Sequence, residues 1–422
     1  MMNKQADLVI YNASELATLA GPAGRPRVGG EMAELAIIPN GAVAVIGEAI
    51  AAVGPYEKVR SEVGIGPETR LLDARQCLVT PGLVDAHTHL VFAGSREDEF
   101  VLKTVHGTSY LEIEKNGGGV PLTVTRTRKA GVDELRAQAR PVLSRMMMNG
   151  TTTLEAKSGY ALTLEGELKL LETMRALDLE GPLEIVPTLF GTHDIPAEFS
   201  QTRDAYLRMV VAELIPAVAR RKLACFCDSG TAFDPDKTDA LLAAARSHGL
   251  RVKVHADEFA AVGGAELAAR NGATSADHCI CSTDAGIAAM VNAGVITVLL
   301  PVVPFVHRLP HPAPGRRFIE AGLPVALGTD FNPSCLNESM QMVMAFSCYT
   351  GGLSPAEAIT AATINSAYAV GRGDRLGSID VGKQADVVIW EVDNHKKLPE
   401  RLGGALAHTV VKKGRIVFRK QG

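Results

Sequence analysis

The sequence is poor in several features that would define a function class. Aromatic residues make up only 5% of its 422 residues, and it has a single tryptophan. It has no basic excess either, because 43 lysines and arginines are set against 47 aspartates and glutamates, giving a formal net charge of −4. Nucleic acids and anionic membranes attract basic surfaces. The charge balance therefore argues against both as partners.

Long apolar runs are also missing. The first twenty residues lack a basic segment followed by an unbroken apolar stretch, as a secretory leader would require. The most apolar later stretch, residues 293–306, is short and is interrupted by Pro301 and Pro304. We therefore expect a soluble, cytoplasmic protein without a membrane span.

Cysteine is too scarce for a disulfide-stabilised secreted fold, with seven residues in the whole chain. Two close pairs, Cys225 with Cys227 and Cys279 with Cys281, could suggest a four-cysteine zinc site. Structural zinc sites usually separate paired cysteines by two to four residues, whereas one residue separates each pair here. We expect buried free thiols in strands instead.

What the sequence does contain is a regular alternation of elements. Residues 81–373 hold eight short apolar runs, each followed by a helical pattern, which predicts an α/β fold with a (β/α)₈ barrel. Residues 1–80 and 374–422 both consist of short strand-like runs separated by turn residues. Strands at both ends around a different middle predict one small β domain built from the N- and C-terminal segments.

Polar residues end many of the apolar runs of the middle region. They are His87, His89, Tyr160, His193, His255, Glu258, His278 and Asp330. In a barrel the carboxyl ends of all strands meet at one mouth, so these side chains would converge there. Alone, each histidine could be a packing residue and Asp330 a helix cap. Together, three imidazoles and a carboxylate suit zinc or ferrous iron with one position left for water.

The motifs "PGLVDAHTH", "HADE", "SADH" and "GTD" resemble, in this order and spacing, those of the amidohydrolase superfamily. That resemblance implies a distorted, TIM-like barrel with a β-sandwich built from both termini. It also implies that His87, His89, His255 and Asp330 hold one zinc or iron ion per subunit. Two-metal members use a carboxylated lysine as a bridge, for which Lys157 is the candidate, but "HADE" is similar to one-metal members.

Longer stretches, including "HTHLVFAGSREDEF" and "EAKSGYALTLEGELKLLE", resemble the branch of the superfamily that acts in histidine degradation. The implied substrate is 4-imidazolone-5-propanoate, a small anionic cyclic amide. Metal-bound hydroxide would attack its ring carbonyl to give N-formimidoyl-L-glutamate. The stretches "NPSC" and "LLPVVPFVHRLP" depart from the pattern of that branch.

This reaction assigns roles to several residues. His278 would orient the water and shuttle its proton with help from Asp330, and Glu258 would protonate a ring nitrogen. Arg96 could hold the carboxylate of the substrate tail through two parallel hydrogen bonds. Its alternative is a surface ion pair with Glu97 or Asp98.

Six further residues are candidates for substrate contact, and each could instead serve packing or turn geometry. They are Tyr110, Tyr160, His193, Asn332, Ser334 and Cys335.

Two other functions fit parts of the pattern. A one-metal amidohydrolase that deaminates a cyclic amidine or purine would use the same metal motif, but a neutral nucleobase does not need Arg96. A non-catalytic scaffold on the same barrel would be expected to lose ligands, and all four are present. A homodimer is the expected assembly.

Overall fold

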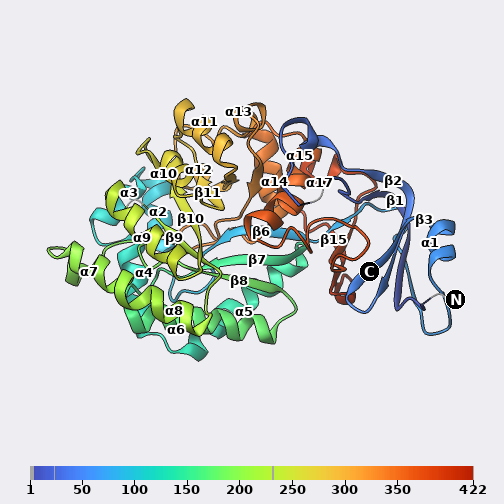
Figure 1. The fold of residues 1–422 in the computed structure, drawn as a ribbon, viewed down its shortest axis with the longest axis horizontal. Coiled ribbons are helices and arrows are strands. Elements are labelled where there is room, and N and C mark those ends of the chain that lie inside the picture. Colours follow the sequence, from blue (N-terminus) through green and yellow to red (C-terminus); the bar gives the residue numbers. More distant parts are fainter. Residues whose placement is uncertain (1–3, 23, 231, 422) are drawn as a thin grey trace.

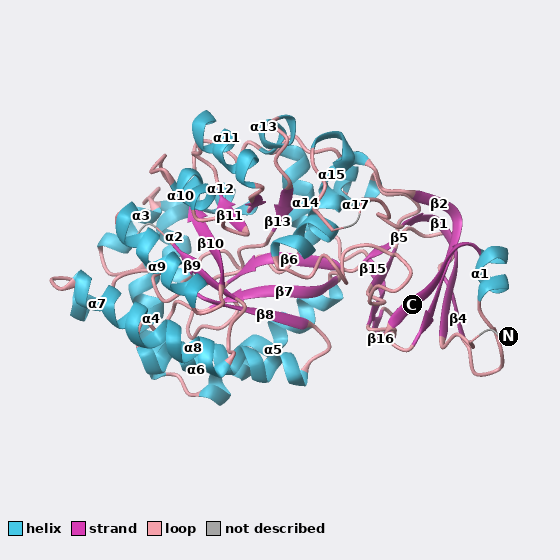
Figure 2. Cartoon of the chain, in the orientation of Figure 1, coloured by secondary structure: helices cyan, strands magenta, loops and turns pink. Residues whose placement is uncertain are grey.

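The structure is a computed structural model that describes residues 4–22, 24–230 and 232–421. Figure 1 shows a large unit of helices surrounding strands, with a smaller β unit at its side that contains the described ends of the chain. Figure 2 places the strands of the large unit at its centre. The predicted α/β fold, a barrel with a small β unit from both terminal segments, is confirmed.

Eight parallel strands form the barrel in chain order, each paired with the next. They are β6 (Leu83–Thr88), β7 (Thr151–Lys157), β8 (Glu184–Leu189), β9 (Phe226–Ser229), β10 (Arg251–Ala256), β11 (Ser275–His278), β12 (Ile296–Leu299) and β13 (Val325–Leu327). Strands of a parallel sheet are covered on both faces, which explains why the sequence reads as apolar runs rather than as an alternation.

Helices connect and surround these strands. After β6 come α2 (Glu97–Val105), α3 (Tyr110–Lys115), α4 (Gly119–Lys129) and α5 (Val132–Met148). The middle of the barrel carries α6 (Leu164–Glu180), α7 (Arg203–Met209), α8 (Ile215–Arg221), α9 (Pro235–Ser247) and α10 (Gly264–Arg270). The remainder are α11 (Asp284–Ala293), α12 (Val302–His307), α13 (Gly315–Glu320), α14 (Met340–Tyr349), α15 (Pro355–Thr360) and α16 (Ser366–Ala369).

The first and last barrel strands meet along a seam formed by the residues that follow β13. The Asp85 carboxylate accepts hydrogen bonds from the backbone N–H of Thr329 at 2.9 Å and from its hydroxyl at 2.6 Å. The Asp330 backbone N–H donates to the carbonyl oxygen of His87 at 3.0 Å. The seam therefore holds His87 and Asp330, 243 positions apart in sequence, next to each other.

The second sheet combines strands from both terminal segments. Its strands are β1 (Leu8–Ala17), β2 (Ile37–Ile46), β3 (Ala49–Pro55), β4 (Arg70–Asp73), β5 (Val79–Pro81), β14 (Val387–Trp390), β15 (Ala407–Lys412) and β16 (Arg415–Arg419). Helix α1 (Tyr56–Glu62) packs on β2 and β3, whereas α17 (Lys397–Glu400) packs on α14 and α15 of the large unit. The strand order is β16-β15-β14-β5-β1-β2-β3, with β4 also paired to β1, so the β5–β14 pair joins the two segments. The boundaries at 80/81 and 373/374 remain predictions.

The only tryptophan lies at this join. Trp390 is fully buried, and its indole N–H donates to the hydroxyl of Thr80 on β5 at 2.8 Å. All seven cysteines are free. The expectation of buried thiols in strands holds only for Cys227 on β9, because Cys225, Cys279 and Cys281 lie just outside β9 and β11, and Cys225 and Cys281 are half-buried. In the ranges that the structure describes, no helix is long and apolar enough to cross a membrane.

Candidate active site

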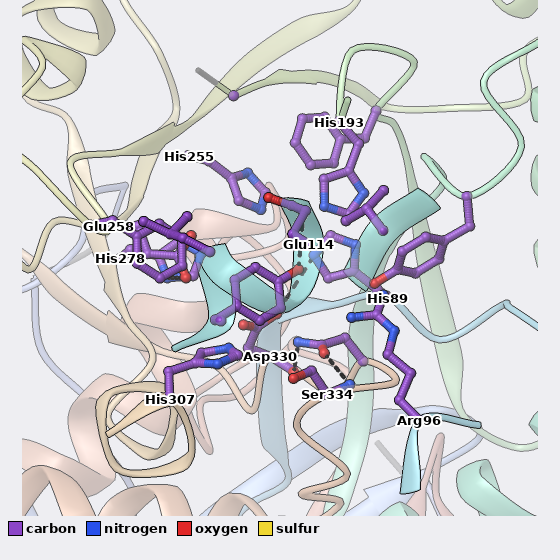
Figure 3. A pocket seen from close by; sticks show the side chains of 18 of the residues that line it. His89, Arg96, Glu114, His193, His255, Glu258, His278, His307, Asp330 and Ser334 are labelled. Carbon is purple, nitrogen blue, oxygen red and sulfur yellow. Dashed lines mark hydrogen bonds and ion pairs between the residues drawn. The ribbon is translucent and has the colours of Figure 1, made fainter. Parts of the chain in front are cut away.

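A cavity of about 310 Å³ opens at the carboxyl ends of the barrel strands (Figure 3). His89, His255, His278 and Asp330 all contribute to its wall, although they come from four different strand ends. His87 is fully buried. Its ring lies 4.7 Å from that of His255 and 5.3 Å from that of His89, measured between centroids.

The side chains of this cluster form a group of potential metal ligands around His87. Its Nε2 atom lies 3.5 Å from Asp330 Oδ1, and His89 Nε2 lies 3.6 Å from the same oxygen. Two overlapping sets each place three ligand atoms within 4.8 Å of one another: His87 with His89 and Asp330, and His87 with His255 and His278. His87 Nε2 and Asp330 Oδ1 are buried without a hydrogen-bond partner. Buried polar atoms normally have a partner, so these two atoms fit a metal ion.

The electrostatics of the cluster fit a divalent cation. Burial lowers the pKa of His87 and of His89 well below the ordinary value, so both rings are neutral and keep a lone pair for a ligand bond. Burial raises the pKa of Asp330 to about 7, because the charged carboxylate has lost its water. A bound cation would offset that cost and favour the ionised carboxylate.

Beneath the cluster, buried carboxylates lie against two of the rings, and one of them is hydrogen-bonded to His87. His87 Nδ1 lies 2.7 Å from Asp277 Oδ2, and His255 Nδ1 lies 3.1 Å from Asp228 Oδ2. The ammonium group of Lys157 joins these carboxylates, at 3.2 Å from Asp277 and 2.7 Å from Asp228. Carboxylates that hold the far nitrogen of a ligating histidine set its tautomer and its direction.

The contacts of Lys157 also decide whether it could bridge two metal ions. Lys157 lies 2.8 Å from Glu155 in addition to the other two carboxylates, and these three anions raise its pKa above the ordinary value despite burial. Carboxylation of a lysine requires a neutral amine. The geometry of Lys157 therefore suits a structural cation rather than a bridging ligand.

Two potential proton-transfer groups face the cavity together. His278 Nδ1 lies 3.7 Å from Glu258 Oε1, and both residues line the cavity. Burial, together with the negative charges of Asp330 and Glu114, raises the pKa of Glu258 well above its ordinary value. A carboxyl group in that state carries a proton that it can donate.

The backbone at two of these residues is unusual. His278 has φ +71° and Asp330 has φ +48°, and neither is glycine. The left-handed region is unfavourable for most side chains, and such residues concentrate at functional sites. Asn and Asp tolerate this backbone conformation better than other non-glycine residues, so asparagine is a suitable substitution at both positions.

Arg96 lies inside the structure rather than on its surface. Its side chain is buried, Nε donates to the Thr123 hydroxyl at 2.8 Å, and Nη1 lies 3.9 Å from Glu99 Oε2. Nη2 is buried without a partner, and Arg96 lines the cavity. The alternative of a surface pair with Glu97 or Asp98 is wrong, because those two residues are exposed while the Arg96 side chain turns inward.

Comparison with known proteins agrees with this geometry. A family model described as "Amidohydrolase family" matches residues 159–418. The chain is 44% identical to an imidazolonepropionase of Geobacillus kaustophilus, over 97% of each chain. It is 45% identical to an imidazolonepropionase of Brevibacillus brevis, again over 97% of each chain. The chain belongs to the imidazolonepropionase family of amidohydrolases.

Solved structures with a similar fold are more distant in sequence. An adenosine deaminase from Xanthomonas campestris with bound zinc is 20% identical, with a TM-score of 0.75 over 99% of this chain and 94% of that chain. A triazine hydrolase variant is 18% identical, with a TM-score of 0.74 over 98% of this chain and 94% of that chain. At these identities the likeness concerns the fold alone.

Five of the six further residues predicted to contact substrate in this imidazolonepropionase-family chain lie at the cavity. Tyr110, Tyr160, His193, Asn332 and Ser334 line the cavity. The Asn332 side chain is already used in its own turn, because its Oδ1 accepts from the Ser334 backbone N–H at 2.8 Å and its amide donates to the Asp330 carbonyl at 2.8 Å.

A substrate contact for the Cys335 side chain is not supported. Cys335 is 1% exposed and is not part of the cavity wall, and its thiol is directed to the carbonyl of Thr329 at 3.9 Å. The reason is the turn: Asn332 Oδ1 also accepts from the Cys335 backbone N–H, at 3.1 Å, which directs this side chain into the core.

Sequence reasoning missed several residues of the cavity wall. Phe190 packs between His193 and His255, with ring centroids 4.6 and 4.4 Å away and nearly parallel planes. Glu114 and His307 also line the cavity. His307 belongs to the stretch "LLPVVPFVHRLP", in which no motif indicated a role for it.

The support beneath the rings leads to a first prediction. Asp277→Asn should weaken metal affinity by about 10–100-fold, the usual cost of losing the partner of a ligating histidine. Competition with a coloured chelator measures this affinity without any substrate. Asp284→Asn, at an exposed position on α11, is the matched control and should leave metal affinity unchanged. Equal affinity in both variants would mean that Asp277 does not orient His87.

Proposed function

We propose that this chain hydrolyses 4-imidazolone-5-propanoate to N-formimidoyl-L-glutamate, the ring-opening step of histidine degradation. The names of its relatives support this substrate. The observation that carries the proposal is the unpartnered, buried Nη2 of Arg96 in the same cavity as the histidine–aspartate cluster. A guanidinium nitrogen left without a hydrogen-bond partner inside a cavity favours an anionic ligand there.

In this proposal His87, His89, His255 and Asp330 hold one zinc or ferrous ion per subunit. When bound, such an ion acts as a Lewis acid that polarises a carbonyl group and makes water acidic enough to react near neutral pH. The neutral rings of His87 and His89 and the unpartnered oxygen of Asp330 support this assignment.

The residues of the chain then supply proton transfer. His278 accepts a proton from the attacking water as the oxygen adds to the ring carbonyl carbon. Glu258 donates its proton to the ring nitrogen as the C–N bond breaks, so that this nitrogen becomes the neutral imino N–H of the formimidoyl group. The two residues lie 3.7 Å apart, which allows the proton taken by one to return to the other.

Binding of the substrate uses the opposite side of the cavity. Arg96 holds the propionate carboxylate, and Tyr110, Tyr160, His193 and Ser334 line the same cavity. Asn332 acts by fixing the turn that presents Ser334.

Arg96→Met tests the proposal directly. A carboxylate contact remote from the reacting carbonyl contributes mainly to binding, so KM for imidazolone propionate should rise by about 10²-fold. Lysine should rescue only in part, because it offers a point charge in place of a planar fork. The rate at which freshly prepared imidazolone propionate loses its ultraviolet absorbance gives KM and kcat for each variant. Arg140→Met, on the exposed face of α5, is the control.

The same assay distinguishes the alternative reaction. A deaminase would release ammonia from a purine or pyrimidine, would leave the imidazolone absorbance intact, and would not respond to Arg96→Met. That set of results would show that the proposed ring opening is wrong and that the chain is a deaminase.

We also propose a cytoplasmic location and a homodimer. Light scattering of the purified chain tests the dimer, since a monomeric mass at micromolar concentration would contradict it.

A further inference from the structure

His307 stands out among the cavity residues to which the proposed reaction gives no role. It is the last residue of α12 and lines the cavity. Its Nδ1 atom is buried and has no hydrogen-bond partner. A buried polar atom left unpaired costs free energy, and a ligand that pairs with it recovers that cost.

Aromatic contacts fix the ring in place. The Tyr110 ring packs edge-on against His307 at 4.6 Å between centroids, and Phe259 stacks in parallel on Tyr110 at 5.8 Å. These three residues come from α3, from the segment after β10 and from α12, so His307 is held by two other parts of the barrel mouth. A side chain held in this way loses little conformational freedom when it binds a ligand.

The surroundings of His307 are positively charged. Burial, with the nearby charges of Lys103 and Arg96, lowers the pKa of His307 to about 3, so the ring is neutral. Lys103 is buried and donates to the Ser334 hydroxyl at 2.9 Å. Glu99 lies near both cations and compensates one of them. Glu114 also lines the cavity, and burial raises the pKa of its carboxyl group.

Figure 3 shows Arg96 and His307 on either side of Ser334. Two polar nitrogens without hydrogen-bond partners, Arg96 Nη2 and His307 Nδ1, thus border one cavity, and the cations of Arg96 and Lys103 both act on His307. A carboxylate has two oxygens, each able to accept from a different donor.

We propose that His307 is a specificity-determining residue whose Nδ1–H donates a hydrogen bond to the carboxylate of the substrate tail, which Arg96 binds from the other side. The identity of this anion rests on the proposed function. The inference goes beyond the proposed function, which gives His307 no role.

Two substitutions separate the hydrogen bond from the packing. His307→Leu keeps an apolar side chain against Tyr110 and removes the donor, whereas His307→Asn places an amide N–H close to the position of Nδ1. His307→Leu should raise KM for imidazolone propionate about tenfold or more, as expected for a lost hydrogen bond to a charged group, and change kcat less than about twofold. His307→Asn should recover most of this loss. His311→Leu, at an exposed position four residues on, is the control.

A second probe makes the test independent of turnover. Glutarate, an open-chain dicarboxylate, should bind more weakly to His307→Leu by the same factor in calorimetry, while the binding of neutral glutaramide should not change. An unchanged KM, an unchanged affinity for glutarate, or a KM change without a glutarate change would each overturn the assignment. If the wild-type chain does not consume imidazolone propionate but binds glutarate in a His307-dependent way, the proposed function fails and the carboxylate site stands.

Discussion

Asp330→Ala is expected to remove bound metal and to reduce turnover below about one-thousandth of the wild-type value, since Lewis-acid assistance contributes several kcal/mol to such reactions. Asp330 is the only carboxylate of the ligand set, and its unpartnered oxygen lies 3.5 Å from His87 Nε2 and 3.6 Å from His89 Nε2. His255→Ala should have the same effect. Elemental analysis of the purified variants measures metal per chain, and the imidazolone assay measures turnover.

The fold should survive these substitutions. Asp330 contributes to the seam through its backbone N–H, which alanine retains. Because φ is +48° at this position, Asp330→Asn is a useful second variant, since asparagine tolerates that backbone while lacking the charge. Circular dichroism checks the fold of each variant, and His311→Ala is the exposed control. Full metal content with retained activity in Asp330→Ala and His255→Ala would disprove the ligand assignment.

His278→Ala is expected to lower kcat by about 10²–10⁴-fold, the usual contribution of general acid–base catalysis. KM should change little, because a proton-transfer group acts mainly in the transition state. His278→Asn controls for the backbone, since φ is +71° at this residue and asparagine accepts it while providing no imidazole. Single-turnover kinetics of both variants separate the chemical step from product release.

Metal content decides between two roles for His278. Its ring lies in one of the two potential ligand sets, with His87 and His255, and also 3.7 Å from Glu258. Full metal with slow turnover supports proton transfer, whereas loss of metal would make His278 a ligand. An unchanged kcat would leave it as a structural neighbour only.

The sequence was sufficient for the fold because the signal of a barrel is repeated along the chain. Eight apolar runs alternate with helical patterns, and the strands observed from β6 to β13 follow that alternation. The join of both terminal segments was predictable for a similar reason, since their strand-like composition differs from that of the middle.

The candidate site was predictable only as far as residue type indicated it. His87, His89, His255 and Asp330 stand at strand ends, and strand ends of a barrel converge. The contacts of Asp228 and Asp277 with the histidine rings could not be predicted, because they depend on which side chains of neighbouring strands face one another. His307 could not be assigned for a similar reason, since its position at the cavity follows from the path of α12 rather than from a motif.

Local turn geometry determines where the Cys335 side chain points. The sequence places this residue next to others that line the cavity, and proximity in sequence suggested a shared role. The hydrogen bonds of Asn332 to two successive backbone N–H groups determine which side chains of the turn face outward, and they direct Cys335 into the core. The same bonds explain why Ser334 reaches the cavity.

The pairing of β5 with β14 joins two strands that the ribosome synthesises at very different times. Strand β5 emerges about 300 residues before β14, the strand that covers its edge. At translation rates of about 5–20 residues per second, the edge of β5 stays unpaired for roughly 15–60 s before β14 is synthesised. An uncovered strand edge is a template for pairing with another chain, so this interval is when the nascent protein is most exposed to aggregation. Chaperone demand in the cell should therefore fall when β14 to β16 are moved ahead of β1 by circular permutation.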